Sequence, residues 1–218
     1  KQGDTLVRNR TNDLDSYQQY LRARALVRAR AISDAIAILE PLVTRNPDYA
    51  PAWAMLANAY SLTTYTPVYR VGSVEEARSV IQSNFDKGEV AARKAIALDS
   101  RVALGYAALG VIQNLRMKWA EGDDLIHQAL ALDSTDPDGL NGYRQGLSVA
   151  GRLKEALRVS EQLQTLEPFV PVFTLATAHV MQLNGQSAAT IALIEVVSTD
   201  ATTSFNRNSR LAMAYAAA

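Results

Sequence analysis

Residues 50–60 read APAWAMLANAY and residues 103–113 read ALGYAALGVIQ, and the spacing that these two stretches share decides the fold. In each, an aromatic side chain, Trp53 or Tyr106, is followed three positions later by leucine and then by a small residue. Steps of 34 residues give repeat starts at 16, 50, 103, 137, 171 and 205, with one interval of 53, which is 34 plus a 19-residue insertion. A period of this length indicates a supersecondary unit that stacks on its neighbours.

The second half of each repeat closes in a common way. In each repeat, a pair of apolar residues precedes a short segment that ends the helix. This segment contains Pro47 in one repeat and Pro168 in another, and proline cannot continue a helix. Gly151 and Gly185 stand between the two halves of their repeats, where the cap of a helix C-terminus needs a positive φ. The pattern therefore predicts two helices in each repeat.

Small residues occupy the positions where paired helices must approach one another closely. They are Ala57, Gly110 and Ala178 on first helices and Ala35 and Ala156 on second helices. Bulky apolar residues fill the positions between them, which is the packing that a helical hairpin of 34 residues requires.

This pattern resembles the tetratricopeptide repeat (TPR) family over residues 16–218. The residues that carry the resemblance are Trp53, Leu56, Ala57 and Tyr60; Tyr106, Leu109 and Gly110; Gly151 and Ala156; and the closing Pro47 and Pro168. The resemblance implies an all-α fold, a right-handed α-α superhelix of about five hairpins plus a final helix, after a lead-in segment at residues 1–15. The chain departs from the family at Thr190, where alanine is preferred, and at residues 205–218, which supply only a first helix.

A narrower resemblance is carried by residues 12–22 (NDLDSYQQYLR), 46–53 (NPDYAPAW) and 118–121 (KWAE). These stretches are similar to the TPR regions of some bacterial class III adenylyl cyclases and winged-helix regulators. The resemblance implies an output domain upstream of the repeats. Because the chain begins at Lys1 without a methionine, we expect it to be a piece of a longer bacterial protein.

The insertion lies within residues 61–87. Residues 63–72 contain a proline and no helical period, which predicts a loop. Ser73 is followed three residues later by Glu76, as in a capping box, and apolar residues then keep helical spacing to Asp99. We predict one helix of about 25 residues, in which Gly88 contacts a neighbouring helix. Two helices that break at Gly88 are the alternative.

Composition excludes several classes of function. The 22 Lys and Arg residues balance 22 Asp and Glu residues, which argues against a nucleic-acid partner. Arg24 and Arg28 share a helix face but Arg22 and Arg30 do not, so this cluster indicates a solvated helix. The longest weakly polar run, residues 102–112, is too short to span a bilayer, so we expect no membrane insertion in this part of the protein.

Residues that would converge in a catalytic or metal site are not apparent in the sequence. The chain has no cysteine, and His127 and His179 stand in separate repeats without a second ligand at a suitable spacing. We therefore expect no metal, no cofactor and no enzymatic activity.

Stacked helical hairpins expose a long concave surface that is built from their first helices. The residues expected to contact a partner there are Tyr17, Tyr20, Arg24, Asn58, Val111, Asn114, Asn141, Gln145 and His179. Apolar burial, amide side chains and arginine suit a peptide or a helix of a protein partner. The resemblance also implies a clamp of Lys, Asn and Arg for a terminal carboxylate in chaperone-binding members, and only Arg24 could serve in it here.

The alternative is a regulatory or dimerisation module that controls an attached output domain, a cyclase or a transcription regulator. Leu211, Met213 and Tyr215 lie on the final helix, where no second helix follows to cover them. On this hypothesis, two copies of the chain form a homodimer through that helix.

Overall fold

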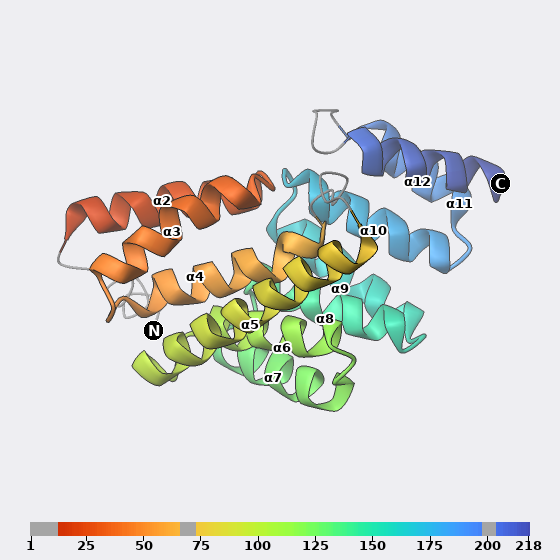
Figure 1. Cartoon of the computed structure of the whole chain (residues 1–218). Coiled ribbons are helices and arrows are strands. Elements are labelled where there is room, and N and C mark those ends of the chain that lie inside the picture. Colours follow the sequence, from red (N-terminus) through yellow and green to blue (C-terminus); the bar gives the residue numbers. More distant parts are fainter. Residues whose placement is uncertain (1–12, 66–72, 198–203) are drawn as a thin grey trace. The chain divides into compact units, whose positions relative to one another are not determined.

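The regular structure of the chain is helical throughout the parts that the computed structural model describes, residues 13–65, 73–197 and 204–218 (Figure 1). In chain order, the α-helices are α2 (Leu14–Arg28), α3 (Ile32–Arg45), α4 (Ala50–Ser61), α5 (Val74–Leu98), α6 (Ala103–Leu115), α7 (Trp119–Leu132), α8 (Pro137–Val149), α9 (Leu153–Leu166), α10 (Pro171–Leu183), α11 (Ser187–Glu195) and α12 (Ser204–Ala216). A short 3-10 helix, η1 (Leu62–Tyr65), follows α4. The expected all-α class is confirmed.

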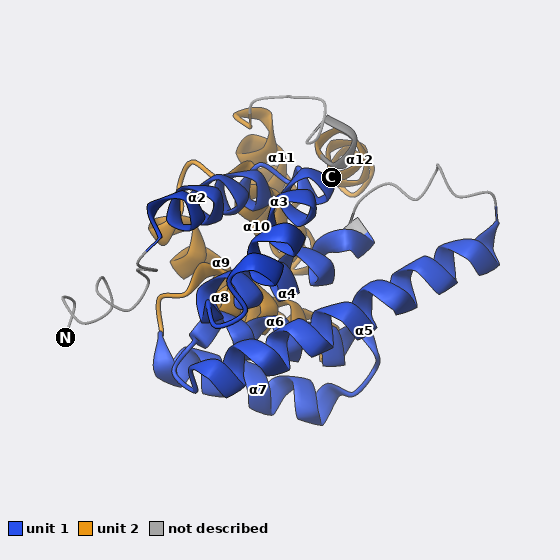
Figure 2. Cartoon of the chain, turned by 60° about the vertical axis from the view of Figure 1, so that its left-hand side comes forward, with its two compact units in different colours: residues 1–133 blue, residues 134–218 orange. Residues whose placement is uncertain are grey.

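The chain divides into two compact units, residues 1–133 and residues 134–218 (Figure 2). In unit 1, α2 pairs with α3, α4 with α5 and α6 with α7, and the first helix α4 also contacts the first helices α2 and α6. In unit 2, α8 pairs with α9 and α10 with α11, while α12 packs on both α11 and α10. Each unit is thus an array of helical hairpins.

Helix α4 lies at the centre of unit 1. Ten of its twelve residues are buried, because α2, α3, α5, α6 and η1 all contact it. Four of its alanines, Ala52, Ala54, Ala57 and Ala59, have no exposed surface and let these neighbours approach closely. The apolar surface that this helix removes from water contributes to the stability of the unit.

Helix α5 is a single helix of 25 residues, as predicted, and the alternative with a break at Gly88 is wrong. It begins where Ser73 Oγ accepts a hydrogen bond from the Glu76 backbone N–H at 3.1 Å. A Cβ atom at Gly88 would lie 2.8 Å from Ile112 Cδ1 and 3.0 Å from Tyr60 Cβ, which confirms the expected close contact. The expected loop over residues 63–72 begins instead with the 3-10 helix, and its residues 66–72 lie outside the described part.

The hairpin of α6 and α7 is held at an especially small separation. A Cβ atom added at Gly110 would lie 2.7 Å from Ile126 Cγ1 and 2.8 Å from the Gly122 carbonyl oxygen. A Cβ atom at Gly122 would lie 2.0 Å from Asn114 Oδ1. Since neither helix has room for a side chain at this crossing, the glycine that the repeat pattern places on α6 is required by packing.

Four hairpin turns share one backbone conformation. Gly151 and Gly185 both have a φ of 75°, as predicted for the cap that follows a first helix. Arg30 and Met117 occupy the equivalent turns after α2 and α6 and also have positive φ, 60° and 64°. The turn geometry is therefore common to both units, although the glycine that favours it is present only in unit 2.

An ion-pair cluster joins α5 to the end of α6. The Arg116 guanidinium, whose side chain is 15% exposed, contacts both Glu89 and Asp86, and Arg93 pairs with Glu89 at 2.7 Å. Partial burial raises the pKa of Glu89, but the hydrogen bonds and charges of Arg93 and Arg116 outweigh it and hold that pKa below its ordinary value. The cluster fixes the end of α6 against the long helix.

Unit 2 contains Thr190, the residue at which the chain departs from the alanine of the TPR pattern. This residue is fully buried, and its hydroxyl donates to the Gln186 carbonyl at 2.9 Å and lies 3.4 Å from the Ala178 carbonyl. A hydroxyl without such partners would be costly in a core. Helix α11 nevertheless ends after nine residues, and Leu211 of α12 packs against the cluster around Ile194 and Leu175.

Candidate functional site

The candidate contact residues of unit 1 lie on its three first helices. Arg24 on α2 is exposed, Tyr17 on α2 and Val111 on α6 are half-buried, and Asn114 is half-buried with Oδ1 turned toward Gly122. The helices that carry these side chains are neighbours, because α4 contacts both α2 and α6. That the side chains form one partner surface stays a prediction.

Tyr20 and Asn58 lie inside unit 1, with 7% and 5% of their surfaces exposed. The Tyr20 ring packs edge to face against Tyr49 at a centroid distance of 5.7 Å. Burial raises the pKa of the Tyr49 hydroxyl well above its ordinary value. Asn58 is buried because α4 is covered on several sides, and its Nδ2 finds no acceptor among the described residues. That Tyr20 and Asn58 contact a partner stays a prediction.

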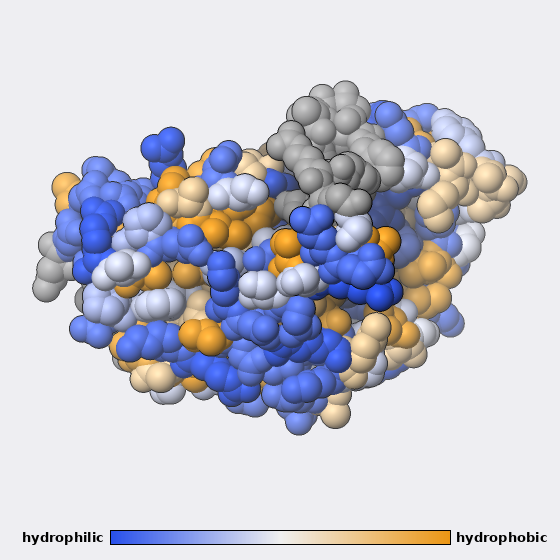
Figure 3. All heavy atoms as spheres, viewed as in Figure 1, coloured by the Kyte–Doolittle hydropathy of each residue, from blue (hydrophilic) through white to orange (hydrophobic). Residues whose placement is uncertain are grey.

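The second-helix side of unit 1 is strongly polar. Figure 3 shows hydrophilic residues over much of the α5 surface that faces the viewer. Lys87, Lys94 and Arg93 are exposed there, and Lys87 Nζ lies 5.7 Å from the centre of the Tyr60 ring. Burial and the hydrogen bond to Glu40 raise the pKa of the Tyr60 hydroxyl. Exposed apolar side chains, Val80 and Val90, interrupt these polar residues on α5.

In unit 2, the candidate residues Asn141 and Gln145 lie on α8 and His179 lies on α10. All three are half-buried. Asn141 Oδ1 accepts hydrogen bonds from Arg144 Nε at 3.2 Å and from its Nη2 at 3.1 Å. This contact holds the Arg144 guanidinium in a fixed orientation.

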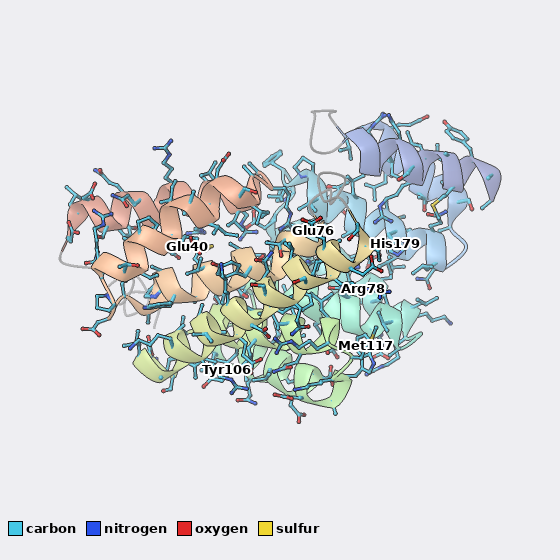
Figure 4. All side chains as sticks on the ribbon, viewed as in Figure 1. Glu40, Glu76, Arg78, Tyr106, Met117 and His179 are labelled. Carbon is cyan, nitrogen blue, oxygen red and sulfur yellow. The ribbon has the colours of Figure 1, made fainter. Side chains whose placement is uncertain are left out.

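The side chain of His179 is labelled in Figure 4, and its imidazole is neutral at physiological pH. Its partial burial, with the positive charges of Arg210 and Arg144, lowers its pKa to about 4. Its Nδ1 is buried and has no hydrogen-bond partner among the described residues. Sequence reasoning placed His179 on a binding surface but gave no sign of its basic neighbours.

Arg144 and Arg210 are the residues of this group that sequence reasoning missed. Arg144 occupies the position at which the other first helices carry a small residue, Ala23, Ala57, Gly110 or Ala178. An arginine there, only 8% exposed, is a departure that the repeat alignment itself could have revealed. Arg210 gives no such signal, because its burial depends on how α12 packs on α10.

No described helix is both long enough and apolar enough to cross a membrane. Within residues 13–65, 73–197 and 204–218, no three His, Asp or Glu side chains group in a way that could hold a metal ion.

Solved structures of known proteins share this fold. A thermophilic TPR protein from Thermus thermophilus is 20% identical with a TM-score of 0.59, over 78% of this chain and 84% of that one. PilF from Pseudomonas aeruginosa is 14% identical with a TM-score of 0.54, over 91% and 88%. A chain of the APC/C hetero-tetramer Cut9-Hcn1 is 16% identical with a TM-score of 0.65, over 92% and 36%. These likenesses show that the helical hairpins have the TPR fold.

Similarity in sequence is weaker. No family model matches the chain. The transcriptional regulator HilA of Salmonella paratyphi A is 26% identical over 168 residues, and HilA of Salmonella typhimurium is 25% identical over the same length. The match covers 76% of this chain but spans only 29% of the length of those regulators.

Proposed function

We propose that this chain, whose hairpins have the tetratricopeptide-repeat fold, is a non-catalytic interaction scaffold that binds a peptide or a helix of a protein partner. The observation that carries the proposal is the arrangement of α2, α4 and α6, adjacent first helices whose accessible residues include Tyr17, Arg24 and Val111. Aromatic and apolar side chains supply buried area, and the arginine supplies a donor for a carboxylate or a backbone carbonyl. The balanced net charge supports a protein partner rather than a nucleic acid.

The double substitution Arg24→Glu and Val111→Lys tests this surface. Peptides that bind the unmodified chain are first selected from a displayed random library. They are expected to bind the variant at least about tenfold more weakly, because the variant reverses the charge at position 24 and puts a lysine in place of the apolar side chain at position 111. The measurement is a titration by fluorescence anisotropy. Lys94→Glu, on the exposed side of α5, is the matched control and should bind as the original does. Equal affinity for all three proteins would place the binding surface elsewhere.

We propose as a second candidate that the chain is the regulatory part of a longer protein. The match to a transcriptional regulator, of which it spans 29%, supports this candidate. Met213 and Tyr215 on α12 are 56% and 57% exposed, as expected for a helix that pairs with another copy. Leu211, in contrast, is partly covered within the unit.

Sedimentation velocity at several protein concentrations tests the dimer. If α12 mediates it, the sedimentation coefficient should rise with concentration for the original chain and stay at the monomer value for Met213→Lys. Ala189→Lys, on the exposed side of α11, serves as the control and should still associate. A chain that remains monomeric at every concentration contradicts the dimer and leaves the scaffold as the proposed function.

A further inference from the structure

A surface groove of unit 2 lies where the turn between α8 and α9 meets the end of α10. Its volume is about 460 Å³, and it is lined by residues 151–155 and by Leu183 and Asn184. This volume falls within the range of about 300–1,000 Å³ that is usual for ligand sites. All of the lining residues belong to unit 2, and none of them is part of the surface of α2, α4 and α6 proposed above.

Asn184, the residue that follows α10, joins the two sides of the groove. Its Nδ2 donates hydrogen bonds to the Leu153 carbonyl at 3.1 Å and to the Val180 carbonyl at 2.9 Å. Because both amide hydrogens are used, the orientation of the amide is fixed and Oδ1 remains as its acceptor. Asn184 Oδ1 accepts no hydrogen bond from the described part of the chain. An N–H group of a bound peptide can therefore use it.

Two leucines form the apolar part of the groove. Leu183, the last residue of α10, is 44% exposed, and Leu153, the first residue of α9, is half-buried. A Cβ atom added at Gly151 would have no other atom within 4 Å, so the space at this position is open. Covering the exposed surface of Leu183 with an apolar side chain of a partner would remove both from water, which favours binding.

The charges of the groove leave one cation without a partner. Arg152 and Glu155 form a bidentate pair, with Nε–Oε1 and Nη2–Oε2 distances of 2.7 and 2.6 Å. The hydrogen bonds from Arg152 hold the pKa of Glu155 below its ordinary value, so this carboxylate stays ionised and matched. Lys154 is exposed and forms no ion pair or hydrogen bond within the described part of the chain. The groove thus has a net positive charge that suits a carboxylate.

We propose that this groove binds a segment of a protein partner in which an apolar side chain stands next to a carboxylate. The apolar side chain packs on Leu153 and Leu183, and Lys154 pairs with the carboxylate. Asn184 Oδ1 accepts a backbone N–H of the same segment. The site is a second docking surface of the chain and does not depend on the surface of unit 1.

Fluorescence anisotropy with a labelled hexapeptide of alternating leucine and aspartate tests the site on the full chain. Lys154→Glu and Leu183→Glu should each weaken binding at least about tenfold, because the first reverses the charge of the cation and the second puts a carboxylate in the apolar part. Lys94→Glu on α5 and Leu166→Glu at the end of α9 are the matched controls. Both controls change the net charge by the same amounts, Leu166 is 41% exposed, and both should bind as the original does.

Two further hexapeptides separate the apolar contact from the charge. A peptide of alternating serine and aspartate and one of alternating leucine and lysine should both bind at least about tenfold more weakly than the first. Equal binding of the serine peptide would reduce the interaction to charge alone, and equal binding of the lysine peptide would remove the role of Lys154. Either result overturns the proposal, as does a leucine–aspartate peptide that does not bind the original chain.

The variant Arg24→Glu with Val111→Lys distinguishes this site from the surface of unit 1. It should bind the leucine–aspartate peptide as the original does. If this variant loses the peptide while Lys154→Glu and Leu183→Glu retain it, the peptide binds unit 1, which overturns the groove and supports the scaffold proposal. Circular dichroism checks that each variant is folded, and Leu183→Gln replaces Leu183→Glu if that variant is not.

Discussion

Replacing Gly110 by valine is expected to destabilise unit 1 by about 3 kcal/mol, at the upper end of what overpacking usually costs. The new Cβ would lie 2.7 Å from Ile126 Cγ1 and 2.8 Å from the Gly122 carbonyl oxygen. The second of these is backbone and cannot rotate away, so α6 and α7 must separate. Unfolding in urea, followed by circular dichroism, gives the free-energy difference.

Gln128→Ala is the control for this substitution, because Gln128 is exposed on α7, the helix that packs against α6, and its side chain is not required by packing. It should change the free energy of unfolding by less than about 0.5 kcal/mol. Gly110→Ala should fall between the two, since its gain in helix propensity of about 1 kcal/mol partly offsets the clash. A stability for Gly110→Val equal to that of the original would mean that the hairpin is not held at this separation.

Lowering the pH from 7 to 4 is expected to remove about 1–2 kcal/mol of stability through His179, because solvent screens part of the effect of its half-buried position. Its pKa is about 4 in the folded chain and 6.5 for the ordinary imidazole of the unfolded chain. The unfolded state therefore takes up the proton first as the pH falls. The contribution of neutral His179 is complete above pH 6.5 and is lost progressively toward pH 4.

The variant His179→Gln isolates this contribution from the carboxylates that titrate in the same range. The difference in unfolding free energy between the original and the variant, measured in chloride buffers, should shrink as the pH falls from 7 to 4. His127→Gln, which removes the exposed histidine on α7, should keep the pH dependence of the original. The same pH dependence in the original and in His179→Gln would contradict a depressed pKa for the buried imidazole.

Much of the fold could be predicted from the spacing of a few residues. Trp53 and Tyr106 mark equivalent positions on α4 and α6, and the capping signal at Ser73 marks the start of α5. These features are local, since a cap or a helical period depends on residues within a few turns. The 3-10 helix at residues 62–65 was not predicted, because it follows from how α4 ends against its neighbours rather than from a motif.

The candidate site was less predictable from the sequence, because accessibility depends on neighbours that are distant in the chain. The repeat phase puts Asn58 on a face of α4, but contacts from several helices bury it at 5% exposure. The charges that lower the pKa of His179 come from Arg144 on α8 and Arg210 on α12, and neither segment of sequence by itself indicates that it lies near His179. The repeat boundaries, the homodimer and the partner contacts stay predictions.

The burial of α4 has a consequence for natural variation. Because ten of its twelve residues are buried, almost every substitution in this helix alters packing. Few substitutions there are therefore expected to leave stability unchanged. In α9, by contrast, only Ala156, Ser160 and Leu163 are buried, so most positions can drift. Among orthologues we expect α4 to change slowly and α9 to diverge quickly, which would leave the APAWAMLANAY stretch as the most durable marker of descent.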